Sequence, residues 1–199
     1  MTNVALILGH PDPGSFSSAI ARAYAEGARA RGATVREINL AGIGFDPVLW
    51  HGYDEVQELE PGLVEAQQTI LWADLLVIAY PTWWGAAPAL LKGFIDRVFL
   101  PGFAFRYREN SKFWDKLLAG RSARLLVTMD TPGWYYRWVV GQPGHRMMGR
   151  SILGFSGVKP VRISRFGAVR GSSADTRRRW LDQARELGER DARRPVKRK

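Results

Sequence analysis

The chain has 199 residues, 46% of them hydrophobic, and contains no cysteine. Its length suits one domain with a substantial core. Without cysteine there is no disulfide, no thiolate nucleophile and no cysteine-ligated metal, and three histidines argue against a histidine-rich metal site. We expect no bound metal. The apolar run that follows Met1-Thr2-Asn3 is too short for a signal peptide or a membrane span, so we expect a cytoplasmic protein.

The formal net charge of +10 is concentrated in the second half of the chain. Residues 1–100 hold six Lys and Arg against eleven Asp and Glu, whereas residues 101–199 hold twenty-three against eight. The excess is densest in RRRW at 177–180 and RRPVKRK at 193–199. Such runs indicate binding to nucleic acid or an anionic surface, or simply a solvated final helix with a basic tail. We favour the second interpretation and expect no nucleic-acid partner.

Apolar runs bounded by turn residues alternate with longer amphipathic stretches along the chain. The pattern predicts strands at 4–10, 34–39, 74–81, 122–129 and 158–166, and helices at 15–31, 63–73, 87–99, 137–156 and 174–190. Strands that are apolar on both faces and alternate with helices belong to parallel sheets covered on both sides. We therefore predict an α/β domain over residues 1–190, with a doubly wound five-stranded parallel sheet, and a basic tail at 191–199.

Ligands of doubly wound sheets bind at the carboxyl ends of the strands, where the strand order switches. This rule selects residues 10–17, 81–85 and 129–136. In GHPDPGSFSSA at 9–19, Gly14 and Ser15 open a helix whose first N–H groups suit a phosphate, although an ordinary helix cap would look the same. The segment is neither a P-loop nor a GxGxxG fingerprint, which argues against ATP and Rossmann-type binding.

Two adjacent tryptophans follow the third predicted strand. Trp83 and Trp84 lie in YPTWWGAAPALLKGFIDRVF at 80–99. Because neighbouring side chains at a strand end face different ways, we do not expect both tryptophans to lie in the core. One of them would form a wall against a flat ligand. A protein interface is the alternative, because tryptophan is enriched there too.

The segment PTWWGAAPALLKGFIDRVFLPGFAFRY at 81–107 resembles the signature of the flavodoxin-like NAD(P)H:quinone oxidoreductases. GHPDPGSFS and INLAGIGFDPVL are similar to further segments of this family, and the likeness runs from about residue 4 to residue 165. The resemblance implies a flavodoxin-like fold with helices on both faces of the sheet. It also implies a flavin-dependent enzyme that passes hydride from NAD(P)H through the flavin to a quinone or similar acceptor.

The resemblance assigns site residues by position. For flavin binding it implies His10, Ser15, Phe16, Ser17, Pro81, Thr82, Trp83, Trp84, Thr128, Met129, Asp130 and Thr131. Met129 and Asp130 are bulkier than the family's Thr-Thr-Gly-Gly run at this place. The resemblance further implies Tyr136 and His145 as active-site residues, and Phe105 and Tyr107 as aromatics of the substrate site across a dimer interface. A Tyr136 hydroxyl or a protonated His145 would stabilise negative charge on the reduced flavin.

The cofactor is expected to be FAD, because relatives with a Trp-Trp loop include FAD binders. FMN is the alternative, since the region after the second strand is short here. The family also contains ancillary subunits of potassium efflux transporters, so a regulatory subunit with a membrane transporter as its partner is an alternative function. A flavodoxin-type electron carrier is another, although such carriers are usually acidic and this chain is basic.

Six aromatic residues lie within sixteen positions just beyond the PTWW helix: Phe99, Phe103, Phe105, Tyr107, Phe113 and Trp114. A small domain whose sheet is already covered has limited core for so many rings. The run therefore predicts an apolar surface cluster, which usually marks an interface. Because two-fold dimers are the commonest assembly, we expect a homodimer.

Overall fold

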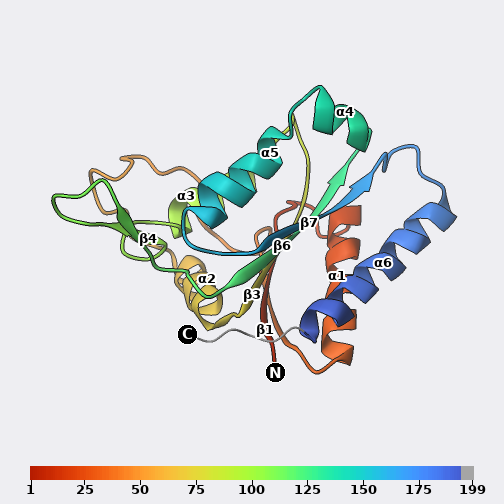
Figure 1. Ribbon diagram of the computed structural model, residues 1–199, viewed down its shortest axis with the longest axis horizontal. Coiled ribbons are helices and arrows are strands. Elements are labelled where there is room, and N and C mark those ends of the chain that lie inside the picture. Colours follow the sequence, from red (N-terminus) through yellow and green to blue (C-terminus); the bar gives the residue numbers. More distant parts are fainter. Residues whose placement is uncertain (194–199) are drawn as a thin grey trace.

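A parallel sheet forms the centre of the computed structural model, which describes residues 1–193 (Figure 1). Its strands are β1 (Asn3–Leu8), β2 (Thr34–Asn39), β3 (Leu75–Pro81), β6 (Ser122–Met129) and β7 (Val161–Gly167). They lie in the order β2-β1-β3-β6-β7, and every neighbouring pair is parallel. The direction of winding reverses between β1 and β3, so the sheet is doubly wound, as predicted.

Helices cover both faces of this sheet (Figure 1). α1 (Phe16–Ala30) and α6 (Ala174–Ala192) lie on one face, whereas α2 (Pro61–Trp72) and α3 (Ala89–Val98) lie on the other. After β6 the chain forms α4 (Gly133–Trp138), α5 (Pro143–Arg146) and the π-helix η1 (Met147–Gly154), and η1 also packs into the core of the second face. Among residues 1–193, no helix is long and apolar enough to cross a membrane.

The strand register brings the loops of the predicted site together. Leu8 of β1 pairs with Asn39 of β2 on one side and with Ala79 of β3 on the other, and Pro81 pairs with Thr128 of β6. The carboxyl ends of β1, β3 and β6 are thus neighbours at one edge of the sheet. The loops that follow them leave from the same edge.

The helix starts were predictable from their caps, but the region after β6 was not. Ser15 and Ser173 cap α1 and α6, and each side chain accepts a hydrogen bond from the backbone N–H three residues later. The helix expected near 137–156, with its start interrupted by Gly141, Pro143 and Gly144, is divided into α4, α5 and η1, and α4 begins earlier than expected, at Gly133. The break occurs because Gly141 and Gln142 both adopt a positive φ, of 78° and 54°, just before Pro143.

The expectation of an exposed aromatic cluster at 99–114 is wrong for most of its members. Phe99 and Phe105 are buried in the core of the second face, and Phe103 and Trp114 pack against it. The reason is an unpredicted antiparallel hairpin, β4 (Phe105–Tyr107) with β5 (Trp114–Lys116), which together with η1 builds extra core. Two rings of the run are exposed: Tyr107 at 65% and Phe113 at 70%.

A buried ion pair fixes the end of α6 to the sheet. Asp191 is 2% exposed, and its carboxylate accepts hydrogen bonds from the Arg124 guanidinium of β6 and the Tyr24 hydroxyl of α1. Residues 191 and 192 therefore belong to the folded domain rather than to the tail that we placed from 191 onward. The rest of that tail, from residue 194, lies outside the described residues.

We expect Asp191→Asn to lower the free energy of unfolding by about 3 kcal/mol, because the Arg124 charge would remain buried without its counterion. Urea unfolding at pH 7 measures this effect. Asp175→Asn is the matched control, since Asp175 is exposed and pairs with Arg178 at the surface of the same helix. Equal effects of the two substitutions would contradict the role that we give to the buried pair.

Candidate functional site

A cavity of about 200 Å³ opens at the carboxyl ends of β1, β3 and β6. Loops after all three strands line it, and all the residues proposed for flavin binding contribute except Trp84 and Thr131. Val169, from the loop after β7, also lines the cavity and was not foreseen. No sequence motif marks it, because only the neighbouring position of β7 in the sheet brings it there.

The first loop is shaped by its own polar side chains. Asp12 Oδ1 accepts a hydrogen bond from the Gly14 N–H at 2.7 Å, and His10 Nδ1 accepts one from the Asp12 N–H at 2.9 Å. Because Nδ1 is an acceptor, the ring hydrogen of His10 lies on Nε2, which is left as a donor. Burial lowers the pKa of His10 and outweighs the opposing effect of Asp12, so the ring is neutral at pH 7.

Thr128 ties the three loops to one another. Its hydroxyl lies 2.6 Å from that of Ser17, and both side chains are buried. Its carbonyl oxygen accepts a hydrogen bond from the Thr82 N–H at 2.7 Å. The Ser17 hydroxyl is thus already engaged, and what the first turn of α1 offers to an anion is its backbone N–H groups, which have no intrahelical partner.

The tryptophan loop is a tight hairpin turn. Trp83 and Ala86 exchange two backbone hydrogen bonds of 3.0 and 2.9 Å, and the two residues between them have φ values of 50° and 76°. These positive angles are those of a type I′ turn, which glycine adopts freely at Gly85 but which is uncommon for a residue like Trp84. The turn directs Trp84 fully into solvent, whereas Trp83 lines the cavity with its ring 5.4 Å from that of His10.

Tyr136 and His145 meet directly behind this turn. Tyr136 donates a hydrogen bond of 2.9 Å to the carbonyl oxygen of Gly85, which also accepts one of 3.0 Å from the Gly144 N–H. A Cβ at Gly144 would lie 2.7 Å from that oxygen, so glycine is required for this close approach. The Tyr136 and His145 rings pack edge to face at 4.9 Å, and both residues are buried.

The structure does not support a protonated His145. Burial, together with the nearby Arg165 guanidinium, lowers its pKa to about 4, so the imidazole is neutral at pH 7. Nδ1 lies 3.4 Å from both Gln142 Oε1 and Arg165 Nε, and Nε2 is buried without a hydrogen-bond partner within the described part of the chain. Burial raises the pKa of Tyr136, whose phenol therefore remains a donor at neutral pH.

The third loop and the basic helix add two further features. Asp130 Oδ1 accepts a hydrogen bond of 2.8 Å from the Arg170 N–H, which closes the loop after β6 onto the loop after β7. Arg177 of α6 places its guanidinium 5.6 Å from the centre of the Phe16 ring, at the entrance of α1. The RRRW run signalled a basic helix, but the proximity of Arg177 to Phe16 follows only from the packing of α6 beside α1.

Phe105 and Tyr107 do not join this cavity. They line a second one of about 220 Å³, with Tyr53, Ile95 and Phe155 among the other residues of its wall. This second cavity lies on the face of the sheet covered by α3 and η1. Across residues 1–193, no group of three or more acidic or histidine side chains is arranged to hold a metal ion.

Comparison with known proteins identifies the family. The chain matches the Flavodoxin_2 family, described as having a flavodoxin-like fold, over residues 2–187 and belongs to it. An uncharacterized NAD(P)H oxidoreductase of Haemophilus influenzae is 29% identical over 173 residues, which are 84% of each chain. The predicted fold and the predicted membership of the flavodoxin-like NAD(P)H:quinone oxidoreductase family are confirmed.

Two further proteins illustrate the likeness. A ribosyldihydronicotinamide dehydrogenase [quinone] of Pongo abelii is 28% identical over 146 residues, which are 63% of this chain and 62% of that protein. The solved structure of an NAD(P)H:quinone oxidoreductase from Methanothermobacter marburgensis superposes with a TM-score of 0.81 and 25% identity, covering 98% of both chains. The likeness to this structure therefore extends over almost the entire chain.

The lowered pKa of His145 predicts a pH-dependent stability. Between pH 6.5 and about 4 the unfolded chain binds a proton at this ring and the folded chain does not, so stability falls as the pH is lowered through this range. Over the whole range, the free energy of unfolding falls by about 3 kcal/mol because of this one group. Urea unfolding at pH 7 and pH 4.5 should show a smaller difference for His145→Gln than for the unchanged protein. His51→Gln, at an exposed histidine, should leave the difference unaltered.

Proposed function

We propose that this protein is a flavin-dependent NAD(P)H oxidoreductase that reduces a quinone or a similar acceptor. The observation that carries the proposal is the convergence of three loops on one cavity at the switch in strand order, with the start of α1 and Trp83 both in its wall. The names of the relatives from Haemophilus influenzae, Pongo abelii and Methanothermobacter marburgensis support the same activity.

The residues present fit a flavin. The backbone N–H groups at the start of α1 and the Nε2 donor of His10 suit the phosphate end. Trp83 offers a flat wall for the ring, and Tyr136 holds the turn that carries this tryptophan. Tyr136 and His145 lie behind the tryptophan turn and are not part of the cavity wall. The buried Nε2 of His145 has no partner among the described residues and is free to form a hydrogen bond.

When bound, a flavin supplies hydride acceptance from NAD(P)H and two-electron transfer to the acceptor. The protein contributes position and protonation states. Tyr136 stays protonated and is a donor, whereas neutral His145 can donate a hydrogen bond through Nε2 but brings no positive charge. Stabilisation of negative charge at this site therefore relies on hydrogen bonds and on Arg165, which lies beside His145.

We propose FAD as the cofactor, with FMN as the alternative. Support comes from Arg177, whose guanidinium beside Phe16 adds a positive charge next to the first turn of α1. FAD carries two phosphates and FMN only one. The second phosphate of FAD would be stabilised by the Arg177 charge, in addition to the stabilisation of the first by the helix start.

We also propose a homodimer. Pockets for cofactor-sized ligands enclose roughly 300–1,000 Å³, whereas the cavity at the strand ends has about 200 Å³, so another wall is needed. The second cavity, with the exposed Tyr107 at its edge, offers such a wall to another copy. Regulation of a membrane transporter has no observation in its favour within the described residues, and the cytoplasmic location stays a prediction from the sequence.

Tyr136→Phe tests the proposed role of the phenol. In this proposal the phenol turns its one hydrogen bond from the Gly85 carbonyl oxygen to the reduced flavin. Removing the hydroxyl while keeping the ring should then slow flavin reduction or reoxidation by roughly ten- to a hundredfold, the value of one hydrogen bond to a charged centre. Stopped-flow absorbance separates the two half-reactions. Tyr135→Phe, at the half-exposed neighbour, is the control. Unchanged rates in both half-reactions would make Tyr136 a residue that only fixes the tryptophan turn.

The dimer is tested at Tyr107 rather than Phe105, because Phe105 is buried in its own chain and its replacement would disturb the fold. Sedimentation at micromolar concentration should give about twice 22.4 kDa for the unchanged protein. Tyr107→Glu should weaken the dimer and lower quinone turnover together, because the charge would be buried at the interface. Leu71→Glu, on the exposed side of α2, should do neither. A fully active monomer would contradict the shared site.

A further inference from the structure

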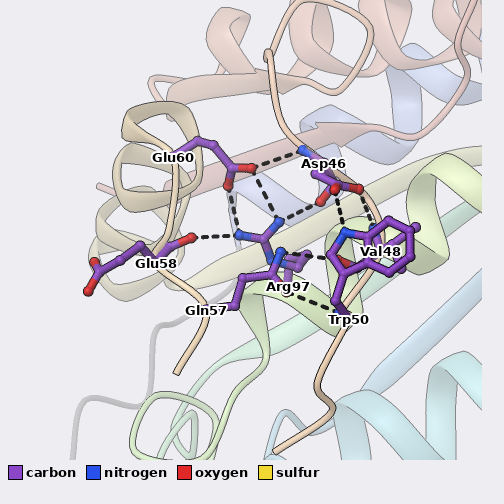
Figure 2. A network of polar contacts seen from close by, with 7 residues as sticks. All are labelled: Asp46, Val48, Trp50, Gln57, Glu58, Glu60 and Arg97. Atoms are coloured by element: carbon purple, nitrogen blue, oxygen red, sulfur yellow. Dashed lines mark hydrogen bonds and ion pairs between the residues drawn. The ribbon is translucent and has the colours of Figure 1, made fainter. Parts of the chain in front are cut away.

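Arg97 is a completely buried arginine that the proposed function does not use. It lies in the last turn of α3, and its exposed fraction is 0%. Figure 2 shows its guanidinium at the centre of a polar network. Nη1 donates to the carbonyl oxygen of Asp46 at 2.6 Å, and Nη2 donates to that of Glu58 at 2.7 Å. The two nitrogens also reach Glu60 Oε1 at 3.2 Å and Oε2 at 2.9 Å.

These contacts hold both ends of one long irregular segment. The connection between β2 and α2 runs over residues 40–60, and segment 46–60 is its second part, without a helix or strand of its own. Arg97 binds the first residue of this segment, Asp46, and two of its last three, Glu58 and Glu60. Both terminal nitrogens of the guanidinium are paired, whereas Nε is buried without a partner among the described residues. Pairing of the two terminal nitrogens with one carboxylate is a forked geometry that suits arginine but not lysine. Burial alone would raise the pKa of Glu60, but bonds from the Asp46 N–H and Arg97 hold it below its usual value.

Further contacts, one against α3 and others within the segment, fix the path of the same residues. Gly93 lies one helical turn before Arg97, and a Cβ there would overlap Pro47. The Gln57 side chain donates to the carbonyl oxygen of Val48 and accepts from the Trp50 N–H, both at 3.1 Å (Figure 2). The segment therefore has one defined path, although it contains no regular secondary structure.

The segment contributes one aromatic side chain to the wall of the second cavity. Tyr53 lies within 46–60, lines that cavity, and packs edge to face on Phe105 with ring centres 6.5 Å apart. Tyr107 also packs edge to face on Phe105, with ring centres 5.3 Å apart. Of the aromatic residues described in the cavity wall, Tyr53 alone comes from segment 46–60, whereas the others belong to β4 or directly follow α3 and η1.

We propose that Arg97 is a positioning residue for acceptor binding: its guanidinium fixes the path of segment 46–60, so that Tyr53 completes the aromatic wall formed with Phe105 and Tyr107. The inference rests on the proposed function and homodimer, in which the second cavity of one copy forms a wall of the acceptor site of the other. The fork of Arg97 is needed because ordering an irregular segment costs conformational entropy at every residue, which a loop with few apolar contacts does not recover.

The first experiment asks whether Arg97 fixes the segment, and it needs no activity. Hydrogen exchange followed by mass spectrometry should show faster exchange over 46–60 in Arg97→Lys and Glu60→Gln. Arg121→Lys is the matched control, because Arg121 also binds two backbone carbonyls, those of Ile70 and Leu71, at the end of α2. It should leave exchange over 46–60 unchanged. Unaltered exchange in both Arg97→Lys and Glu60→Gln would overturn the proposal.

The second experiment measures 1,4-naphthoquinone reduction by the flavin-loaded enzyme. Arg97→Lys, Glu60→Gln and Tyr53→Leu should each raise the quinone KM roughly three- to tenfold, the contribution of an edge-to-face aromatic contact. The rate of flavin reduction by NADH or NADPH should not change. In a Tyr53→Leu background, Arg97→Lys should add no further rise in KM, because the ring that it positions is already absent.

The outcomes separate the inference from the function on which it rests. Additive effects of Arg97→Lys and Tyr53→Leu on the quinone KM, or an equal loss in flavin reduction, would overturn the positioning role while quinone reduction itself stands. If the unchanged protein binds flavin but reduces no quinone, the proposed function fails and the acceptor role of Arg97 fails with it. The exchange experiment would still decide whether Arg97 holds the segment.

Discussion

Thr128 is the point on which the geometry of the candidate site depends. It is the penultimate residue of β6, pairs in register with Pro81, accepts the backbone hydrogen bond of Thr82 and shares a buried hydroxyl contact with Ser17. These contacts set the spacing of three loops that are far apart in the sequence. The parallel sheet brings the loops to one edge, and Thr128 fixes how closely they approach. The cavity is a consequence of this junction, since all three loops contribute to its wall.

On each face of the sheet, one buried arginine forms an ion pair that fixes the position of a chain segment. Arg124 pairs with Asp191 and secures the last helix, whereas Arg97 pairs with Glu60 and secures an irregular connection. A buried ion pair contributes little net stability compared with apolar packing, but it strongly disfavours any arrangement that leaves one charge alone. Such pairs therefore define where a chain segment lies. The segment that Arg97 holds in place contains Tyr53 of the second cavity wall, so this ion pair bears on function.

The strands, the caps at Ser15 and Ser173, and the grouping of the cofactor loops could be predicted because each depends on local patterning and one topological rule. The hairpin at 105–116 and the short helix α4 could not, because the burial of Phe105 and of Tyr136 depends on tertiary packing. The break near Gly141 was expected from the glycines and Pro143. The expectation of a protonated His145 was wrong, because burial and the nearby Arg165 set the charge state of this ring and neither can be read from residue types. Val169 and Arg177 reach the site only through the neighbouring positions of β7 and α6.

The most direct test of a flavin at the strand ends is the absorbance spectrum of the purified protein after incubation with FAD or FMN and removal of excess cofactor. Mass measurement of the extracted group identifies what is retained. The account predicts a yellow protein with about one flavin per chain, and FAD retained in preference to FMN. A colourless protein that retains neither flavin at micromolar concentration would contradict the assignment of the cavity and the function built on it.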